Sequence, residues 1–180
     1  MSDKGAPDTQ FTHFDSAGNP HMVNVQDKSE TDRVAIAEAV VVMNSSTREG
    51  IEQRAMKKGD VLAIAELAGI MGAKRTADLI PLCHPIPITN VTVESRWASE
   101  PKQAGMAELI LTARVSATYR TGVEMEALTA CTTAALTVYD MCKALDRTMS
   151  IERTRLLYKH GGKSGTFDRR DERLQEKSRG

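Results

Sequence analysis

The stretch GVEMEALTACTTAALTVYDMCKALD, residues 122–146, predicts one long α-helix from Gly122 to about Leu145, because it has no proline and no glycine after its first residue. Most of its side chains are small or apolar, as in a helix that is buried on several sides. The segments on either side of it, Met106–Thr118 and Ser150–Lys159, predict strands. The centre of the fold is therefore a strand, a helix and a strand in succession.

Two more strands and two helices are predicted upstream: strands at Arg33–Met43 and Asn90–Trp97, and helices from Ser46 to about Ala55 and from Val61 to about Leu79. A capping box at Ser46–Glu49 begins the first helix, and Asp60 caps the second. The order strand, helices, strand, strand, helix, strand predicts an α+β fold of the ferredoxin-like type, with an antiparallel sheet and the helices on one face.

The other face of this sheet is left without cover. Val40, Val42, Leu109 and Leu111 are expected to point to that face. An exposed apolar sheet face favours burial against another subunit.

The chain has 180 residues, with 24 Lys and Arg against 24 Asp and Glu, and fits one folded domain. Residues 1–20 predict a flexible arm, 21–167 a single ferredoxin-like domain and 168–180 a charged flexible tail. A neutral chain with 4% aromatic residues favours neither nucleic-acid nor membrane binding. Three unpaired cysteines and the lack of an apolar leader predict a cytoplasmic protein.

The long helix carries polar residues that its apolar surface does not explain. Asp140 and Lys143 are three residues apart, so they form either a structural ion pair or a proton-transfer pair. Glu124 completes a second capping box with Thr121, and a helix cap is the favoured interpretation for it. Glu126 has no such role and lies on the same helical stripe as Asp140.

Three other segments could bind ligands. Lys159–Gly165 (KHGGKSG) combines lysines with glycines that expose backbone N–H groups, which suits an anion, although a flexible linker fits equally. Lys58 lies at a helix junction, where dipole compensation is the simpler explanation. His84 is held in a stiff loop, PLCHPIP, but no second pair of ligands supports zinc beside Cys83, so no metal site is predicted.

Five motifs in order, KKGD, AGIMGAKRTADLIPLCHP, TGVEMEALTA, ALTVYDMCKALD and LLYKHGGKSG, closely resemble the MoaC family, the cyclic pyranopterin monophosphate synthases of molybdenum cofactor biosynthesis. The resemblance covers about residues 12–167, so residues 21–167 are expected to be the catalytic domain. It implies a lyase that converts 3′,8-cyclo-7,8-dihydroguanosine 5′-triphosphate to the cyclic phosphate of a pterin and releases pyrophosphate. It also implies a homohexamer, a trimer of dimers, with active sites where subunits meet.

The resemblance also implies roles for single residues. Asp140 is expected to be the catalytic acid–base residue, together with Lys143 and Lys58. The substrate-binding residues are expected to be Leu82, Cys83, His84, Met125, Glu126, Glu124, Lys159, Lys163 and, with weaker support, Arg33. The chain departs from the family pattern at Asn24, Tyr158 and His160, which affects the details of phosphate contact.

Two other functions compete with this one. A nucleotide sensor of the same fold would need the glycine loop and His84 but not the pair Asp140 and Lys143. An RNA-binding module would need aromatic residues on its central strands, and the segments 33–43 and 106–118 contain none. No tightly bound cofactor is expected, and whether Mg²⁺ accompanies the triphosphate stays open at this stage.

Overall fold

The computed structural model describes residues 18–53, 59–100 and 103–169. The strands are β1 (Thr31–Asn44), β2 (Asn90–Trp97), β3 (Met106–Tyr119), β4 (Ser150–His160) and β5 (Phe167–Asp168). The helices are α1 (Ser45–Glu52), α2 (Val61–Lys74), α3 (Thr76–Leu79) and α4 (Glu124–Cys142).

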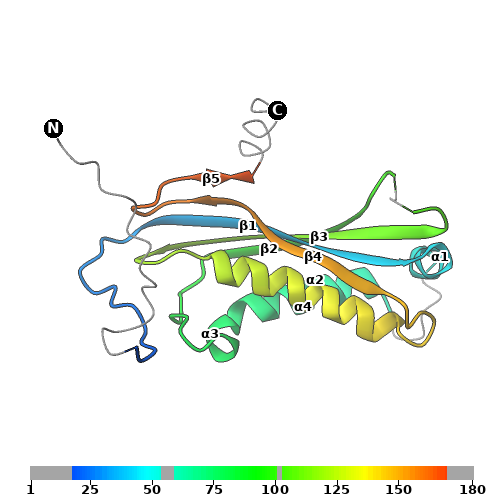
Figure 1. Ribbon diagram of the computed structural model, residues 1–180, viewed down its shortest axis with the longest axis horizontal. Coiled ribbons are helices and arrows are strands. Elements are labelled where there is room, and N and C mark those ends of the chain that lie inside the picture. The colour runs from blue at the N-terminus through cyan, green and yellow to red at the C-terminus, as the bar shows by residue number, and fades with distance from the viewer. Residues whose placement is uncertain (1–17, 54–58, 101–102, 170–180) are drawn as a thin grey trace.

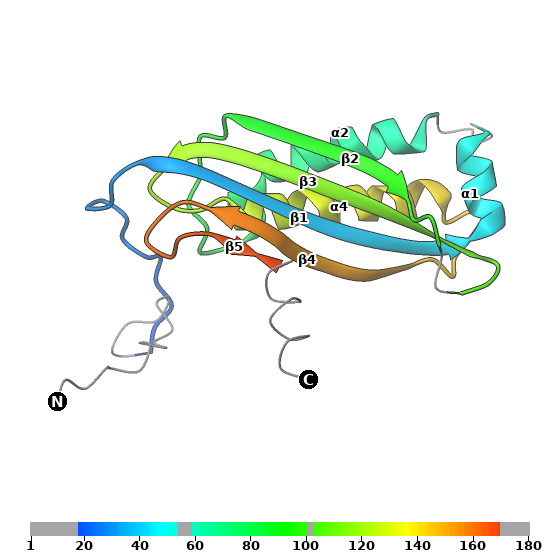
Figure 2. The ribbon, with the colours of Figure 1, turned by 90° about the horizontal axis from the view of Figure 1, so that it is seen from above.

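One antiparallel sheet, in the order β2-β3-β1-β4-β5, carries the helices α2, α3 and α4 on one face (Figures 1 and 2). The first four strands with their connecting helices have the ferredoxin-like arrangement. The predicted fold class is therefore confirmed, and only the short edge strand β5 was not anticipated.

Small side chains let α4 lie close against the sheet. Ala35, Ala37 and Ala39 of β1 are fully buried, as are Ala127 and Ala130 of α4. Alanine on both surfaces brings the two backbones together without a cavity. On the other side of α4, Gly69 of α2 meets the carbonyl oxygen of Ala130, because a Cβ at Gly69 would lie 2.9 Å from that atom.

Local signals at the helix ends were only partly correct. Asp60 caps α2, since its carboxylate accepts a hydrogen bond of 3.1 Å from the amide of Ala63. The predicted capping box at Ser46–Glu49 is wrong: α1 begins one residue earlier, at Ser45, and has no side-chain cap. The predicted helix to Leu79 is interrupted at Arg75, so α2 and α3 are separate.

The uncovered sheet face was predicted correctly for Val40 and Val42 but wrongly for Leu109 and Leu111. In the register of β1 and β3, Leu109 lies opposite Val41 and Leu111 opposite Ala39, and all four belong to the core beneath the helices. The residue beside Val40 on the open face is Ile110.

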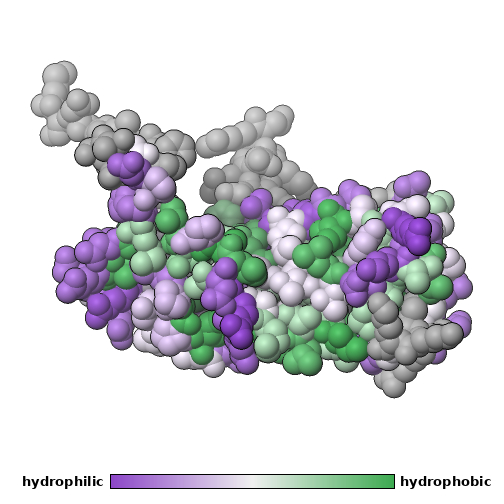
Figure 3. Space-filling view, turned by 90° about the horizontal axis from the view of Figure 1, so that it is seen from below, coloured by the Kyte–Doolittle hydropathy of each residue, from purple (hydrophilic) through white to green (hydrophobic). Residues whose placement is uncertain are grey.

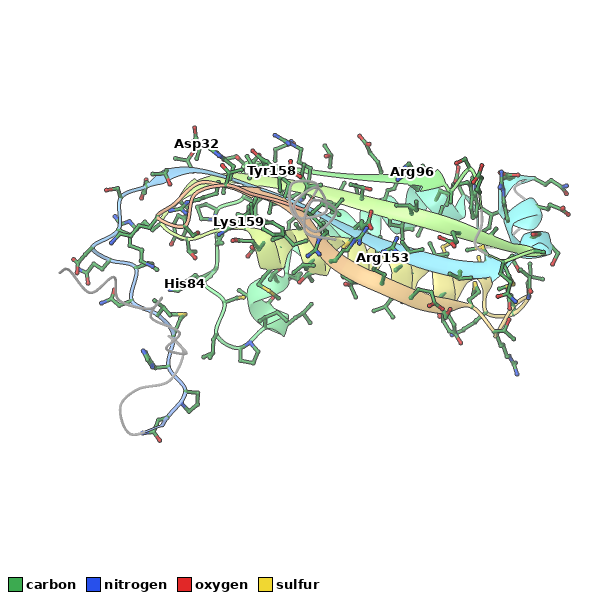
Figure 4. All side chains as sticks on the ribbon, turned by 45° about the horizontal axis from the view of Figure 1, so that its top comes forward. Asp32, His84, Arg96, Arg153, Tyr158 and Lys159 are labelled. Atoms are coloured by element: carbon green, nitrogen blue, oxygen red, sulfur yellow. The ribbon has the colours of Figure 1, made fainter. Side chains whose placement is uncertain are left out.

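The open face is a groove of about 680 Å³ in which apolar residues alternate with charge. Arg153 and Arg155 of β4 donate to the buried carboxylate of Glu38 at 3.2 and 2.9 Å. Figure 4 shows Arg96 and Arg153 over the central part of the sheet, on this side of the strands. The face thus combines apolar residues of β1 and β3 with arginines of β2, β3 and β4 around the Glu38 carboxylate.

The outer surface of the helix layer is also apolar in places. Leu67, Met71 and Leu79 are about half exposed, at 60%, 48% and 59%, and Leu136 of α4 is 56% exposed. Hydrophobic residues, in green, form patches on this face in Figure 3. Within the described ranges, no helix is long and apolar enough to cross a membrane.

The end of the described chain is held against β4. β5 pairs with it through Tyr158 and Asp168, and Arg169 donates a hydrogen bond of 2.8 Å to the carbonyl of Leu156. Asp168 and Arg169, which the sequence places at the start of the tail, are therefore part of the folded domain.

The close approach of α2 to α4 can be tested with Gly69→Ala. Alanine is the better helix former by about 1 kcal/mol, yet its methyl group would press on the Ala130 carbonyl and on Val93. We expect the crowding to outweigh the propensity, so the variant loses about 1–2 kcal/mol in urea unfolding. Ala63→Gly, at an exposed site of the same helix, calibrates the propensity term. A Gly69→Ala variant more stable than the wild type would show that the two helices are not in close contact.

Candidate active site

The glycine loop after β4 lies directly over Arg33 of β1. Gly161 and Gly162 have positive φ angles of 105° and 77°. A Cβ at Gly162 would overlap Nη1 of Arg33, and one at Gly161 would overlap the backbone carbonyl oxygen of Asp32, so together with the positive φ angles both positions favour glycine. Arg33 is fixed from the other side, since its Nε donates to the carbonyl of Tyr119 at 3.1 Å.

Lys159 and Lys163 flank this loop. The ammonium of Lys159 donates to the hydroxyl of Ser164 at 2.5 Å and lies 3.4 Å from the carboxylate of Glu124. His160 closes the loop through a 2.9 Å contact between its Nδ1 and the hydroxyl of Thr166. The loop is therefore a built part of the fold, and the interpretation as a flexible linker is wrong.

A hollow of about 620 Å³ opens beside the loop. Its charged lining residues are Lys28, Arg33, Arg120, Lys159 and Lys163, with Asp27 and Glu124 as the acids. Five cations against two carboxylates make the hollow suited to an anion with several charges. This local excess exists in a chain of zero formal charge.

Sequence reasoning missed Lys28 and Arg120. Both lie in loops without periodicity, and neither belongs to a recognisable motif. Arg120 holds the segment that carries Lys28, because it donates to the carbonyl of Gln26 at 3.0 Å and pairs with Glu30 at 3.5 Å. The only sequence signal for Arg120 was its position directly before the TGVE motif.

The first turn of α4 carries Glu124 to the lining of this hollow, and Glu126 follows two residues later in the same turn. The predicted capping box at Thr121–Glu124 is wrong, because Val123 is at the cap position and no side chain caps the helix. Glu124 is the first residue of the helix rather than its third, which leaves its carboxylate to pair with Lys159.

Glu126 is 3% exposed, and its Oε2 has no hydrogen-bond partner among the described residues. Burial raises the pKa of Glu126 to about 7, and the nearby charge of Glu124 adds to the shift, against a smaller lowering by a hydrogen bond from its own backbone. A buried carboxyl group with an unused oxygen is suited to a ligand that brings N–H donors.

The loop with Leu82, Cys83 and His84 lies next to this carboxyl group. The pKa of the Cys83 thiol is raised by burial and then by the charge of Glu126, so the two side chains lie in the same electrostatic environment. Figure 4 shows His84 at the end of the molecule where Lys159 lies. Met125 follows Glu124 in the first turn of α4 and is partly buried.

Asp140 and Lys143 lie in the last turn of α4, where they are 59% and 53% exposed. The Lys143 ammonium donates to the Asp140 carboxylate at 2.6 Å. This hydrogen bond, and then the charge of Asp140, raises the pKa of Lys143, so Lys143 is an ammonium at neutral pH.

The predicted site residues thus form two groups at opposite ends of α4. The amino-terminal cluster consists of Arg33, Leu82, Cys83, His84, Glu124, Met125, Glu126, Lys159 and Lys163. The carboxyl-terminal pair consists of Asp140 and Lys143. Glu126 and Asp140 are fourteen residues apart, about 21 Å along the helix axis. Lys58 lies outside the described residues, and the residues that are described contain no group of three or more metal-ligating side chains.

Comparisons with known proteins identify the family of the chain. A model of the MoaC family matches residues 22–162. The chain is 56% identical over 157 residues to the cyclic pyranopterin monophosphate synthase of Rhodospirillum rubrum, which covers 87% of this chain and 92% of that protein. It is 53% identical to the protein of the same name from Jannaschia sp. over 88% of this chain and 94% of the relative.

The likeness extends to a more distant bacterium, since the protein of that name from Geobacillus sp. is 48% identical over 161 residues. The matched region spans helices α1 to α4 and strands β1 to β4, and it contains both groups of site residues except Lys163. The chain belongs to the MoaC family.

Proposed function

We propose that this chain is a cyclic pyranopterin monophosphate synthase of molybdenum cofactor biosynthesis. It is a lyase that converts 3′,8-cyclo-7,8-dihydroguanosine 5′-triphosphate to cyclic pyranopterin monophosphate and releases pyrophosphate. The observation that supports this most is the cationic hollow lined by Glu124, with the buried Glu126 carboxyl group two residues along the same helix, in a chain whose relatives bear that name. The reaction takes place in the cytoplasm, where GTP-derived substrates are made.

The triphosphate binds in the hollow. Lys159, Lys163 and Arg33 neutralise its charge, and the exposed backbone N–H groups of the glycine loop donate to its oxygens. Lys28 and Arg120 add two cations to the opposite wall. No tightly bound cofactor takes part, and any Mg²⁺ arrives with the triphosphate as its counterion.

The guanine-derived ring binds at Glu126, between Met125 and the loop Leu82–His84. Its N–H donors occupy the free carboxylate oxygen. Because the pKa of Glu126 is about 7 without ligand, binding of these donors draws the group into its ionised form.

The carboxyl-terminal pair performs the proton transfers. Opening of the purine and closure of the pterin require protons to be removed and returned, and Asp140 and Lys143 hold one proton between them at 2.6 Å. Lys58 is assigned to the same catalytic group on the basis of the resemblance to the MoaC family alone. A pure sensor would have no use for this pair.

One chain cannot bring both groups to one substrate, because about 21 Å of rigid helix separates them. A second subunit therefore supplies the pair that completes each site. A trimer of dimers needs two different interfaces. The open sheet face around Val40 and Ile110, and the apolar outer face of α2 around Leu67 and Met71, are the surfaces proposed for them.

The activity is tested directly by supplying the cyclised GTP intermediate and measuring pyrophosphate release and pterin formation. Turnover that depends on Asp140 is expected. Binding of the intermediate without any turnover would favour a sensor and overturn the proposal.

Composite sites can be tested by subunit complementation. Asp140→Asn and Lys159→Met should each be inactive alone, because each damages one half of every site. Mixed oligomers of the two should recover about a quarter of the wild-type activity, the fraction of sites that combine two intact halves. As a control, Asp140→Asn mixed with Lys143→Met should recover nothing, since both lie in the same pair. Equal failure of both mixtures, with mixed oligomers formed, would place the whole site in one subunit.

Glu126→Gln should separate stability from binding. The unfolded chain ionises Glu126 near pH 4.5 but the folded chain only near pH 7, so the wild type loses stability between these values. The variant lacks this loss, and its advantage should grow to at most about 3 kcal/mol by pH 7. Its affinity for the substrate should fall at least tenfold, whereas its affinity for inorganic triphosphate should not change. Parallel stability curves from pH 5 to 8 would show that Glu126 is not buried as described.

Gly162→Ala tests the contact between loop and guanidinium. Its methyl group would overlap Arg33, so the affinity for pyrophosphate in calorimetry should fall at least tenfold. Gly165→Ala is the matched control, because its φ is also positive, at 67°, but nothing lies within 4 Å of its Cβ position. If the two variants bind pyrophosphate equally well, Arg33 does not depend on the loop for its place.

A further inference from the structure

Asp146 is a buried carboxylate that lies outside both groups of site residues. It is 3% exposed, and each of its oxygens accepts two hydrogen bonds. Oδ1 accepts from the amide of Thr148 at 2.9 Å and from its hydroxyl at 2.6 Å. Oδ2 accepts from the amide of Asn44 at 2.9 Å and from the hydroxyl of Thr47 at 3.2 Å.

These four bonds join two parts of the chain that are far apart in sequence, the junction of β1 with α1 and the turn before β4. Asn44 ends β1, Thr47 lies in the first turn of α1, and Thr148 leads into β4. Asp146 itself belongs to the turn after α4, where its amide donates to the carbonyl of Cys142 at 3.1 Å. Lys143 begins the same turn, and its amide donates to the carbonyl of Tyr139 at 2.8 Å.

The charge of Asp146 is stabilised rather than poised for proton transfer. Burial alone would raise its pKa, but the hydrogen bonds from Asn44, Thr148 and Thr47 outweigh that effect and hold the pKa below its usual range. The group therefore stays ionised at any pH at which the protein works. The role of Asp146 therefore follows from the chain segments that its hydrogen bonds hold in place.

We infer that Asp146 is a positioning residue for the pair Asp140 and Lys143. It fixes the turn after α4 against β1 and α1, and so keeps the Lys143 ammonium on the Asp140 carboxylate. The importance of this for turnover rests on the proposed function, whereas the effect on the pair does not.

Asp146→Asn is the direct test, because an amide offers one acceptor oxygen where the carboxylate offers two. The amide of Asn44 or the amide of Thr148 then faces an NH₂ group and loses its partner. Glu66→Gln is the matched control: Glu66 is also a carboxylate that joins two elements, accepting from the amide and hydroxyl of Ser95 at 3.1 and 2.6 Å, and it lies in α2.

Two measurements are made on each full-length variant. The first is the pKa of the Lys143 ammonium by NMR titration, in which Asp140 and Tyr139 are the titratable neighbours. It should fall in Asp146→Asn and stay unchanged in Glu66→Gln. The second is steady-state kinetics, in which kcat should fall at least tenfold in Asp146→Asn with KM within twofold of the wild type.

Thr47→Val removes one hydroxyl donor to Asp146 and keeps the Asp146 carboxylate. This variant is the second test and replaces Asp146→Asn if that variant does not fold. It should shift the Lys143 pKa in the same direction by a smaller amount. The emission of Trp97, the single tryptophan, also reports on α1, because Arg48 of that helix lies 5.1 Å from the ring centre.

An unchanged pKa of Lys143 in both Asp146→Asn and Thr47→Val would overturn the inference and leave Asp146 a purely structural residue. A wild type without turnover would contradict the proposed function instead, and the titration would still decide the role of Asp146.

Discussion

The contact of α4 with the sheet on one side and α2 on the other is the constraint on which the rest of the molecule depends. It requires small residues along the whole seam, Ala35 to Ala39 on β1, Ala127 to Ala134 on α4 and Gly69 on α2. Such packing allows no sliding or tilting of the helix without overlap of backbone atoms. Since α4 carries site residues in its first and last turns, its position fixes both ends of the site at once.

This constraint explains how a neutral chain can form a strongly cationic hollow. The cations of the hollow come from four separate segments, the loop at Lys28, the strand at Arg33, the turn at Arg120 and the loop at Lys159. None of these segments is a run of basic residues, and the whole chain contains as many acidic as basic residues. Only the packed fold brings them together, around a glycine loop too close to Arg33 for any side chain.

The elements were predictable from the sequence because their signals are local and long. Asn90–Trp97 was predicted with its observed limits, and α4 within three residues at each end. The two capping boxes failed because each helix begins at another residue than predicted: α1 begins at Ser45, before the predicted cap Ser46, and α4 begins at Glu124, whose carboxylate pairs with the distant Lys159. Leu109 and Leu111 were assigned to the wrong face because side-chain alternation gives the face only after the register with β1 is known.

The same comparison shows which part of the site a sequence can reveal. The motifs named the residues of both groups, but a list of motifs contains no distances, so it could not show which of these residues lie together in one chain. The spacing in the sequence supplies the missing distance. Glu126 and Asp140 are fourteen residues apart, which in one unbroken helix corresponds to about 21 Å. A rigid helix therefore acts as a spacer that prevents one subunit from closing its own site. In the proposed function, catalysis therefore depends on assembly, and the apolar surfaces proposed to join the subunits are as much a part of the active site as the residues proposed to touch the substrate.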